Sequence, residues 1–365
     1  MGMIKLAVSA CGPPRDAATW SGTPANLIAA LEEQGCEVLA IDWSKAIPPA
    51  ARVFESVSRR ILLRPGVGLR TFAARRRASD YVLNVARKAG FNRILHTGSL
   101  DLPTGDTTSG EDHALFCDST WHTATTYSGA KANRDNAVYE AAEADGYRSV
   151  NKFFPTACYV RDSLVSHYGV AAKDVLPVGT GLGRPHHFCG EKDYAGNRIL
   201  MVARASFEDK GGPLLLEAFD IARRTHPDMR LTIVGSESDR RAIEAHPGVT
   251  FLGFLPEDEL HRLFAEASLF AMPALYEPWG LVYLEALATK TPILGLDRCS
   301  LPEFTRDGRY GFLVSEPSPE AVGRALVEAT SDPDRLRRMG LEGQRYCSLN
   351  YDWSLVAERI LDGLA

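Results

Sequence analysis

Short apolar runs alternate with amphipathic stretches of helical length through most of the chain. A short apolar run is typical of a buried strand, and its regular alternation with helical stretches is typical of parallel βαβ units. The strands expected in the first half are Ile4–Ala10, Cys36–Asp42, Asn92–His96, Ala114–Cys117, Ser149–Pro155 and Val175–Val178. Those expected in the second half are Arg198–Ala203, Arg230–Gly235, Val249–Leu252, Ser268–Met272 and Thr291–Gly295. The clearest expected helices are Pro24–Gln34, Thr156–His167 and Pro213–Thr225.

A segment rich in glycine and polar residues, Gly181–Asn197, separates the two series. It predicts a first domain at residues 1–185 and a second at 186–350, with the amphipathic tail 351–365 forming a helix that completes the first domain. The expected fold class is α/β, with two doubly wound, Rossmann-like parallel-sheet domains facing a central cleft. Open parallel sheets bind ligands outside the carboxyl ends of their strands, so we expect the chemistry on the loops that follow strands.

Composition and charge narrow the class of protein. Hydrophobic residues make up 45% of the chain and charged residues 24%, as in a soluble globular protein. The net charge of −5 argues against a nucleic-acid partner. Seven scattered cysteines without a Cys-x-x-Cys pair indicate reduced thiols in the cytoplasm, and the nine histidines lack the spacing of metal ligands. The sequence therefore predicts no metal site.

The loop ARASFEDKGG follows the first strand of the second series. It carries two cations, Arg204 and Lys210, and ends in Gly211 and Gly212, which allow close backbone approach to a ligand. The helix that follows offers free amides and the positive end of its dipole, so the loop suits a diphosphate. The alternative interpretation is a pair of solvated basic residues.

The stretch YEPWGLVYLEA places two carboxylates around a helix start. Glu277 is expected beside the cleft, where it could contact a sugar, and Glu285 lies on the helix, where it could accept both hydroxyls of a ribose. The amides of Gly280 and Leu281 would point at phosphate oxygens. An ordinary helix entry with glutamates near its start is the alternative.

Two loops in the first half of the chain are also candidate ligand-binding loops. In WSGTP, Gly22 precedes a helix and offers a second phosphate-accessible helix start, unless the loop is purely structural. In FCDSTWH, Asp118 follows a strand and is expected to orient a hydroxyl of the acceptor or of the donor sugar, unless it caps a helix.

Taken in order, these loops resemble the family-4 retaining glycosyltransferases of GT-B architecture. The resemblance is strongest in RILMVARASFEDKGG, LTIVGS, VTFLGFLPEDEL, LFAMPALYEPWGLVYLEALATKTPILG and LPEFTRDGRYGFLV. It implies that Arg204 and Lys210 neutralise the donor diphosphate, that Glu277 contacts the transferred sugar, and that Glu285 contacts the ribose. Many members carry a histidine where this chain has Asp118, and a double glycine where it has Ser21 and Gly22.

The implied reaction moves a sugar, with retention, from a UDP-sugar or GDP-sugar, of which the UDP-sugar is favoured, to a hydroxyl of a glycolipid, lipopolysaccharide or other cell-envelope glycan. Fixed cations and helix-end amides stabilise the leaving diphosphate, so neither a cofactor nor a metal is expected. A nucleotide-sugar epimerase and a non-catalytic nucleotide-sugar-binding protein remain as alternatives. A nicotinamide-dependent dehydrogenase is disfavoured, because no Gly-x-Gly-x-x-Gly follows the first strand of either series.

Residues 51–88 are strongly basic and interleaved with apolar residues, in an otherwise acidic chain. Such a segment can dock on anionic lipid, which would bring the protein to the inner face of the cytoplasmic membrane. A solvated helix or an acceptor-loop charge cluster is the alternative.

Overall fold

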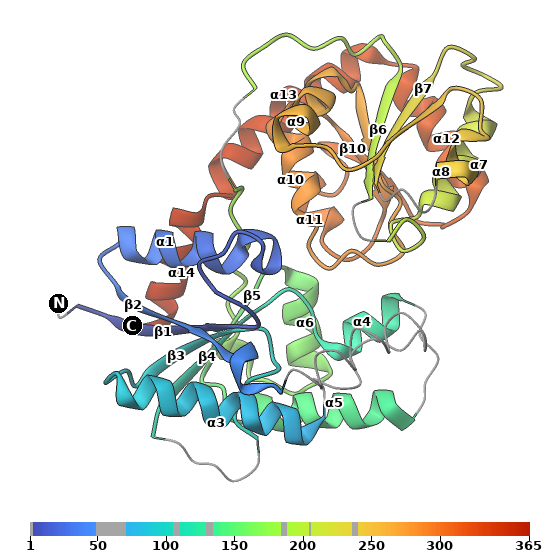
Figure 1. The fold of residues 1–365 in the computed structure, drawn as a ribbon. Coiled ribbons are helices and arrows are strands. Elements are labelled where there is room, and N and C mark those ends of the chain that lie inside the picture. Colours follow the sequence, from blue (N-terminus) through green and yellow to red (C-terminus); the bar gives the residue numbers. More distant parts are fainter. Residues whose placement is uncertain are drawn as a thin grey trace. The chain divides into compact units, whose positions relative to one another are not determined.

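A computed structural model describes residues 3–48, 71–104, 110–128, 134–183, 188–203, 206–235 and 240–365. The chain divides into two compact units: unit 1 is Met1–Gly183 with Asp352–Ala365, and unit 2 is Arg184–Tyr351. Each unit is a parallel β-sheet covered by helices (Figure 1), as expected from the alternating pattern. Among the described helices, none combines the length and apolar character needed to cross a bilayer.

Unit 1 contains a five-stranded sheet in the order β2-β1-β3-β4-β5, with every pairing parallel. Its strands are β1 (Lys5–Ala10), β2 (Glu37–Asp42), β3 (Arg93–Thr97), β4 (Asp112–Cys117) and β5 (Lys152–Pro155). Its helices are α1 (Thr23–Glu33), α3 (Phe72–Lys88), α4 (Trp121–Tyr127), α5 (Arg134–Tyr147), α6 (Cys158–Ser166) and α14 (Trp353–Leu364). The described part of unit 1 also holds the 3-10 helices η1 (Thr19–Gly22), η2 (Trp43–Ala46) and η3 (Ala172–Asp174).

Helices cover both faces of this sheet. Figure 1 shows α1 and α14 on one face, and α3 with α5 on the other. Trp353, Val356 and Ile360 of α14 share one buried core with Leu27 of α1 and with β1, β3 and β4. The second core joins α3 to the opposite faces of β1 and β3. Because both faces are covered, the strands carry the continuous apolar runs seen in the sequence.

The strand expected at Val175–Val178 is wrong. The segment runs along the edge of β5, where the amides of Leu176 and Val178 donate to the carbonyls of Phe153 and Pro155, each at 2.9 Å. Only one isolated bridge forms, between Phe153 and Val175. Pro155 has no amide hydrogen to donate back, so the contact does not extend into a ladder.

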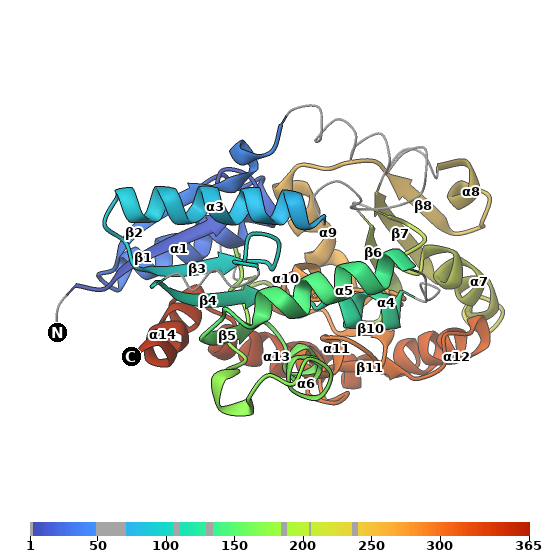
Figure 2. The same ribbon diagram turned by 90° about the horizontal axis from the view of Figure 1, so that it is seen from below.

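Unit 2 contains a six-stranded parallel sheet in the order β11-β10-β9-β6-β7-β8. Figure 2 shows its strands β6, β7 and β8 next to one another. Its strands are β6 (Arg198–Ala203), β7 (Arg230–Gly235), β8 (Val249–Leu252), β9 (Leu269–Ala271), β10 (Ile293–Leu296) and β11 (Gly311–Val314). Its helices are α7 (Gly212–Ala222), α8 (Arg240–Glu244), α9 (Glu257–Glu266), α10 (Leu281–Ala288), α11 (Leu301–Thr305), α12 (Pro319–Thr330) and α13 (Pro333–Asn350). The edge strand β11 was not among the expected strands, because its four-residue run GFLV follows a charged turn.

Each sheet has one point at which the direction of strand succession reverses. In unit 1, β1 lies between β2 and β3, and in unit 2, β6 lies between β7 and β9. The connections on either side of such a point leave toward opposite faces, which opens a crevice at the carboxyl ends of the two strands. We therefore expect ligands to bind at the loops after β1 and β3 in unit 1, and at the loops after β6 and β9 in unit 2.

Candidate functional site

The loops after β6 and β9 bring two predicted residues together. Lys210 lies in the loop between β6 and α7, and Glu277 lies between β9 and α10. The Lys210 ammonium donates to Oε2 of Glu277, and the two side chains are only 21% and 15% exposed. These residues are far apart in the sequence, yet they form an ion pair at the reversal point of the unit 2 sheet.

Close backbone packing holds this pair in place. Gly211 has a φ of +75°, and a Cβ on it would lie 2.0 Å from the carbonyl oxygen of Pro273. The neighbouring amide of Leu275 donates to the carbonyl of Asp209 at 3.0 Å. Only glycine permits both the left-handed φ and the close approach, so Gly211 fixes Lys210 against the loop that carries Glu277.

The helix starts beside the pair lack side-chain caps. Gly280, with a φ of +83°, is the N-cap of α10, and Gly211 is the N-cap of α7. The Gly212 amide at the start of α7 donates to the Phe207 carbonyl at 2.8 Å, and Pro213 has no amide hydrogen, so the first amides of α10 are the ones that can serve a ligand. Leu281 is the first residue of α10, and Glu285 lies one turn further along it, partly buried.

The structure thus gathers Lys210, Glu277 and Gly280 with the start of α10. Arg204, predicted as the second diphosphate-binding cation, lies outside the described residues. Behind the loop, the Tyr283 hydroxyl donates to the carbonyl of Met272 at 3.2 Å. Burial, reinforced by the Glu277 carboxylate, raises the pKa of Tyr283 well above its usual value, so this phenol stays protonated and serves as a donor.

Unit 1 has a cavity of about 280 Å³ at its own reversal point. It lies at the carboxyl ends of β1, β3 and β4, and its polar and aromatic lining includes Trp20, Thr97, Asp118, Trp121 and Glu143. Asp118, predicted as a hydroxyl-orienting residue, is therefore a cavity wall residue. Indole faces and carboxylates in a pocket of this kind suit a hydroxyl-rich ligand.

The loop before α1 borders this cavity in a strained conformation. Trp20, Ser21 and Gly22 have consecutive φ values of 44°, 54° and 78°, and Gly22 is the N-cap of α1. Trp20 lines the cavity, whereas Gly22 is not among its lining residues. Ser21 stands where many members of the resembled family carry the first glycine of a pair. It adopts the same left-handed backbone, which costs a serine more than it costs a glycine.

Two buried charges that support the cavity were not predicted as site residues. Glu143, 5% exposed, accepts from Ser99 Oγ at 2.9 Å and from the Trp121 amide at 2.6 Å. Arg75, 2% exposed, donates to the Ser99 carbonyl at 2.6 Å, and burial lowers its pKa. Together they clamp the loop after β3. The prediction that the basic residues of 51–88 dock on lipid or are solvated is wrong for Arg75, because its side chain is buried on the inner side of α3.

A buried polar cluster lies beneath the same loop. Asp101 Oδ2 accepts from Ser9 Oγ at 2.5 Å and lies 2.8 Å from His96 Nδ1, while His96 Nε2 lies 3.0 Å from His113 Nδ1. Burial and the neighbouring His96 lower the pKa of His113 to about 4. Ser9 and His96 share one carboxylate oxygen, and all four side chains are at most 3% exposed. The cluster therefore orders the β1 and β3 ends instead of presenting a nucleophile.

Known proteins resemble this chain in both sequence and fold. Residues 187–346 match the model of the family described as glycosyl transferases group 1. The alpha-maltose-1-phosphate synthase of Mycolicibacterium smegmatis is 32% identical over 160 residues, which are 39% of this chain and 41% of that protein. The GDP-mannose-dependent alpha-(1-6)-phosphatidylinositol monomannoside mannosyltransferase of the same organism is 28% identical over 57% of this chain and 60% of its own. The chain thus spans only part of the length of these curated relatives.

Solved structures share the whole fold. The sucrose-phosphate synthase of Thermosynechococcus elongatus has a TM-score of 0.75 at 16% identity, covering 98% of both chains. Anabaena Alr3699/HepE in complex with UDP and glucose has a TM-score of 0.65 at 14% identity, covering 99% of both chains. At such identities the likeness concerns the fold. Residues 187–346 are thus similar to the glycosyl transferases group 1 family, and the two parallel-sheet units have the GT-B fold.

Proposed function

We propose that this chain is a retaining, metal-independent glycosyltransferase of family 4, which transfers a sugar from a nucleotide diphosphate sugar to an acceptor hydroxyl. The donor is a UDP-sugar in preference to a GDP-sugar, and the acceptor is a cell-envelope glycolipid or glycan. The relative named a GDP-mannose-dependent mannosyltransferase and the solved HepE complex with UDP and glucose support this class of donor.

One observation carries the proposal: the ion pair of Lys210 and Glu277 beside the uncapped start of α10. The carboxylate holds the ammonium in position. When a donor binds, its diphosphate supplies the anion, and Lys210 can face the phosphate oxygens while Glu277 turns to the sugar hydroxyls. The free amides of Gly280 and Leu281 add neutral donors and the positive end of the helix dipole.

The chemistry follows from the charges that develop. As the glycosyl–oxygen bond to the diphosphate breaks, negative charge grows on the leaving phosphate and positive charge on the sugar ring. Lys210 and the helix-end amides stabilise the first, and the Glu277 carboxylate stabilises the second. The acceptor oxygen bonds to the anomeric carbon on the face that the phosphate leaves, and the acceptor proton passes to the departing phosphate oxygen.

The unit 1 cavity is the proposed acceptor subsite. Asp118 offers a carboxylate to a sugar hydroxyl, and its own Oδ1 accepts from Ser119 Oγ at 3.2 Å, which restrains its rotation. Trp20 and Trp121 supply apolar ring surface for the carbon face of a sugar. Gly22 positions the strained loop that carries Trp20.

Docking on anionic lipid stays part of the proposal. Residues 51–70, which hold much of the basic segment, lie outside the described residues. On α3, Arg76 and Arg77 are exposed, whereas Arg75 is buried. Co-sedimentation with vesicles containing phosphatidylserine at low salt tests the docking, and the absence of binding under these conditions would remove it.

The function is tested with a panel of nucleotide sugars, measured by calorimetric binding and by slow hydrolysis without acceptor. Lys210→Ala should weaken donor binding, Glu277→Ala should abolish turnover while the donor still binds, and Glu285→Ala should chiefly raise the donor Kd. Lys152→Ala is the matched control. Lys152 also pairs with a carboxylate, Asp174 at 2.8 Å, but it lies at the amino end of β5.

The outcomes separate the alternatives. Donor conversion to a free epimer without acceptor would identify an epimerase, and donor binding without transfer or hydrolysis would identify a non-catalytic binding protein. Full activity in both Glu277→Ala and Glu285→Ala would remove the site assignment altogether.

A further inference from the structure

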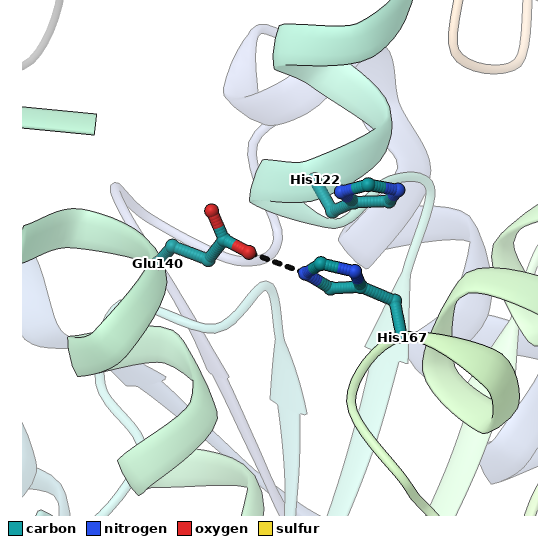
Figure 3. Close-up of side chains that lie close together, drawn as sticks. All are labelled: His122, Glu140 and His167. Atoms are coloured by element: carbon teal, nitrogen blue, oxygen red, sulfur yellow. Dashed lines mark hydrogen bonds and ion pairs between the residues drawn. The ribbon is translucent and has the colours of Figure 1, made fainter. Parts of the chain in front are cut away.

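Three potential metal ligands converge in unit 1, beside the cavity described above. They are His122 of α4, Glu140 of α5 and His167, which follows the last residue of α6 (Figure 3). One ligand atom from each lies within 4.8 Å of the other two. His167 Nε2 bonds to Glu140 Oε1, and the rings of His122 and His167 stack with centroids 3.6 Å apart.

A partly buried pair of hydrogen bonds holds the three helices in this arrangement. The Tyr168 hydroxyl donates to Glu143 Oε2 at 2.7 Å and accepts from the His122 amide at 3.2 Å. Tyr168 is the neighbour of His167, and Glu143 lies one turn from Glu140 on α5. The backbones that carry the three ligands are therefore fixed relative to one another before any ion binds.

We propose that His122, Glu140 and His167 form a site for a divalent transition metal ion, with zinc as the occupant. Two imidazoles and one carboxylate are a ligand set that zinc accepts, with the fourth position left to water. A nitrogen-rich set of this kind favours zinc, nickel or copper over magnesium and manganese.

Binding requires one ring to turn. The two rings are inclined by only 13°, so a single ion cannot lie in both ring planes while they remain stacked. His167 has 36% of its side chain exposed, which leaves it room to rotate and present a lone pair. The ion replaces the stacking contact and the His167–Glu140 bond with three coordinate bonds.

The consequence concerns the wall of the unit 1 cavity. Trp121 and Ala124 of α4 line that cavity, and the ion would tie α4 to α5 and to the end of α6. Zinc would therefore stiffen the proposed acceptor subsite. The site is structural and does not depend on the proposed function.

The test uses tag-free, full-length protein stripped with EDTA and dialysed into chelator-free buffer. Zinc chloride titrated by calorimetry should bind at one equivalent and raise the melting temperature by about 5 °C. Copper loaded at one equivalent should give an electron paramagnetic resonance spectrum with coupling to two nitrogens. His167→Ala and Glu140→Gln should each weaken zinc binding by roughly tenfold or more.

His246→Ala is the matched control, because His246 also contacts a carboxylate, Asp220, at 2.6 Å, but without a second histidine in the pair. It should bind zinc as the parent protein does. Zinc binding that survives His167→Ala unchanged would overturn the proposal and assign the ion to another part of the chain, such as the exposed Cys11 or Cys189. The absence of binding at millimolar zinc would overturn it as well.

Discussion

Replacing Gly211 by alanine tests whether backbone packing positions the candidate donor site. Gly211 combines a φ of +75° with a distance of 2.0 Å between an added Cβ and the Pro273 carbonyl oxygen. The substitution therefore forces two changes: a left-handed alanine, and a separation of the loop after β6 from the loop after β9. Lys210 and Glu277 lie on these two loops, so the separation acts directly on their ion pair.

The expected loss of stability in Gly211→Ala is judged against Gly308→Ala, a substitution of another left-handed glycine in the same unit. Gly308 has a φ of +88°, but a Cβ there would meet only the Gly311 carbonyl oxygen, at 3.8 Å. Gly308→Ala then carries the left-handed strain of roughly 1–2 kcal/mol, offset by about 0.4–1 kcal/mol from the stiffer unfolded chain. Gly211→Ala adds the overlap, which the loops relieve by moving about 1 Å, at a further cost of roughly 1–3 kcal/mol. We expect it to cost about 2 kcal/mol more than Gly308→Ala.

The assay is urea denaturation of both variants, with peptide-resolved hydrogen exchange to assign the change to the β6 and β9 region. Donor affinity is measured on the same samples, and it should fall for Gly211→Ala while Gly308→Ala keeps the parent value. Equal stability losses in the two variants, together with unchanged donor affinity in Gly211→Ala, would refute the reasoning. In that case the close packing against Pro273 would not be what holds Lys210 beside Glu277.

Three further predictions concern pH, strain and metal. The pKa of His113 is lowered to about 4, so the unfolded chain takes up the proton first as pH falls below 6.5; stability should drop by up to about 3 kcal/mol between pH 6.5 and 4, and His113→Gln should flatten that part of the urea-midpoint profile. Ser21→Gly should raise the unfolding free energy by about 0.5–1 kcal/mol in denaturant melts, because it relieves a φ of 54°; a loss of stability would show that the serine is not strained. Sugar transfer should continue in EDTA at 25 °C, and loss on chelation with rescue by manganese or magnesium would contradict metal-independent chemistry.

The sequence pattern was sufficient for much of the fold because its signals are local. Runs such as RILMVA and RLTIVG predicted β6 and β7 with the same bounds that the structure has. The pattern failed at Val175–Val178, where hydrogen bonding depends on Pro155 of another segment, and it missed the short edge strand β11. In both cases, whether the segment forms a strand depends on hydrogen bonds with another part of the chain.

Some site residues could also be predicted from local sequence signals, whereas others could not. Lys210, Glu277 and Gly280 could be singled out because each follows a predicted strand or begins a predicted helix. No local sequence signal predicts that Glu143 and Arg75 are buried beside the cavity. In the sequence, Glu143 resembles an acidic residue on a helix surface, and Arg75 is one of several neighbouring basic residues. His122 and His167 lack ligand spacing and meet only because three helices pack together.

By itself the sequence determined two parallel-sheet α/β units and the loops on which chemistry should lie, because the period of apolar residues and the position of glycines are encoded within each segment. Only the tertiary structure decided that Lys210 and Glu277, 67 residues apart, form one ion pair. Their meeting requires β6 and β9 to be neighbours, and strand order depends on how helices pack over the whole sheet, which no single segment records.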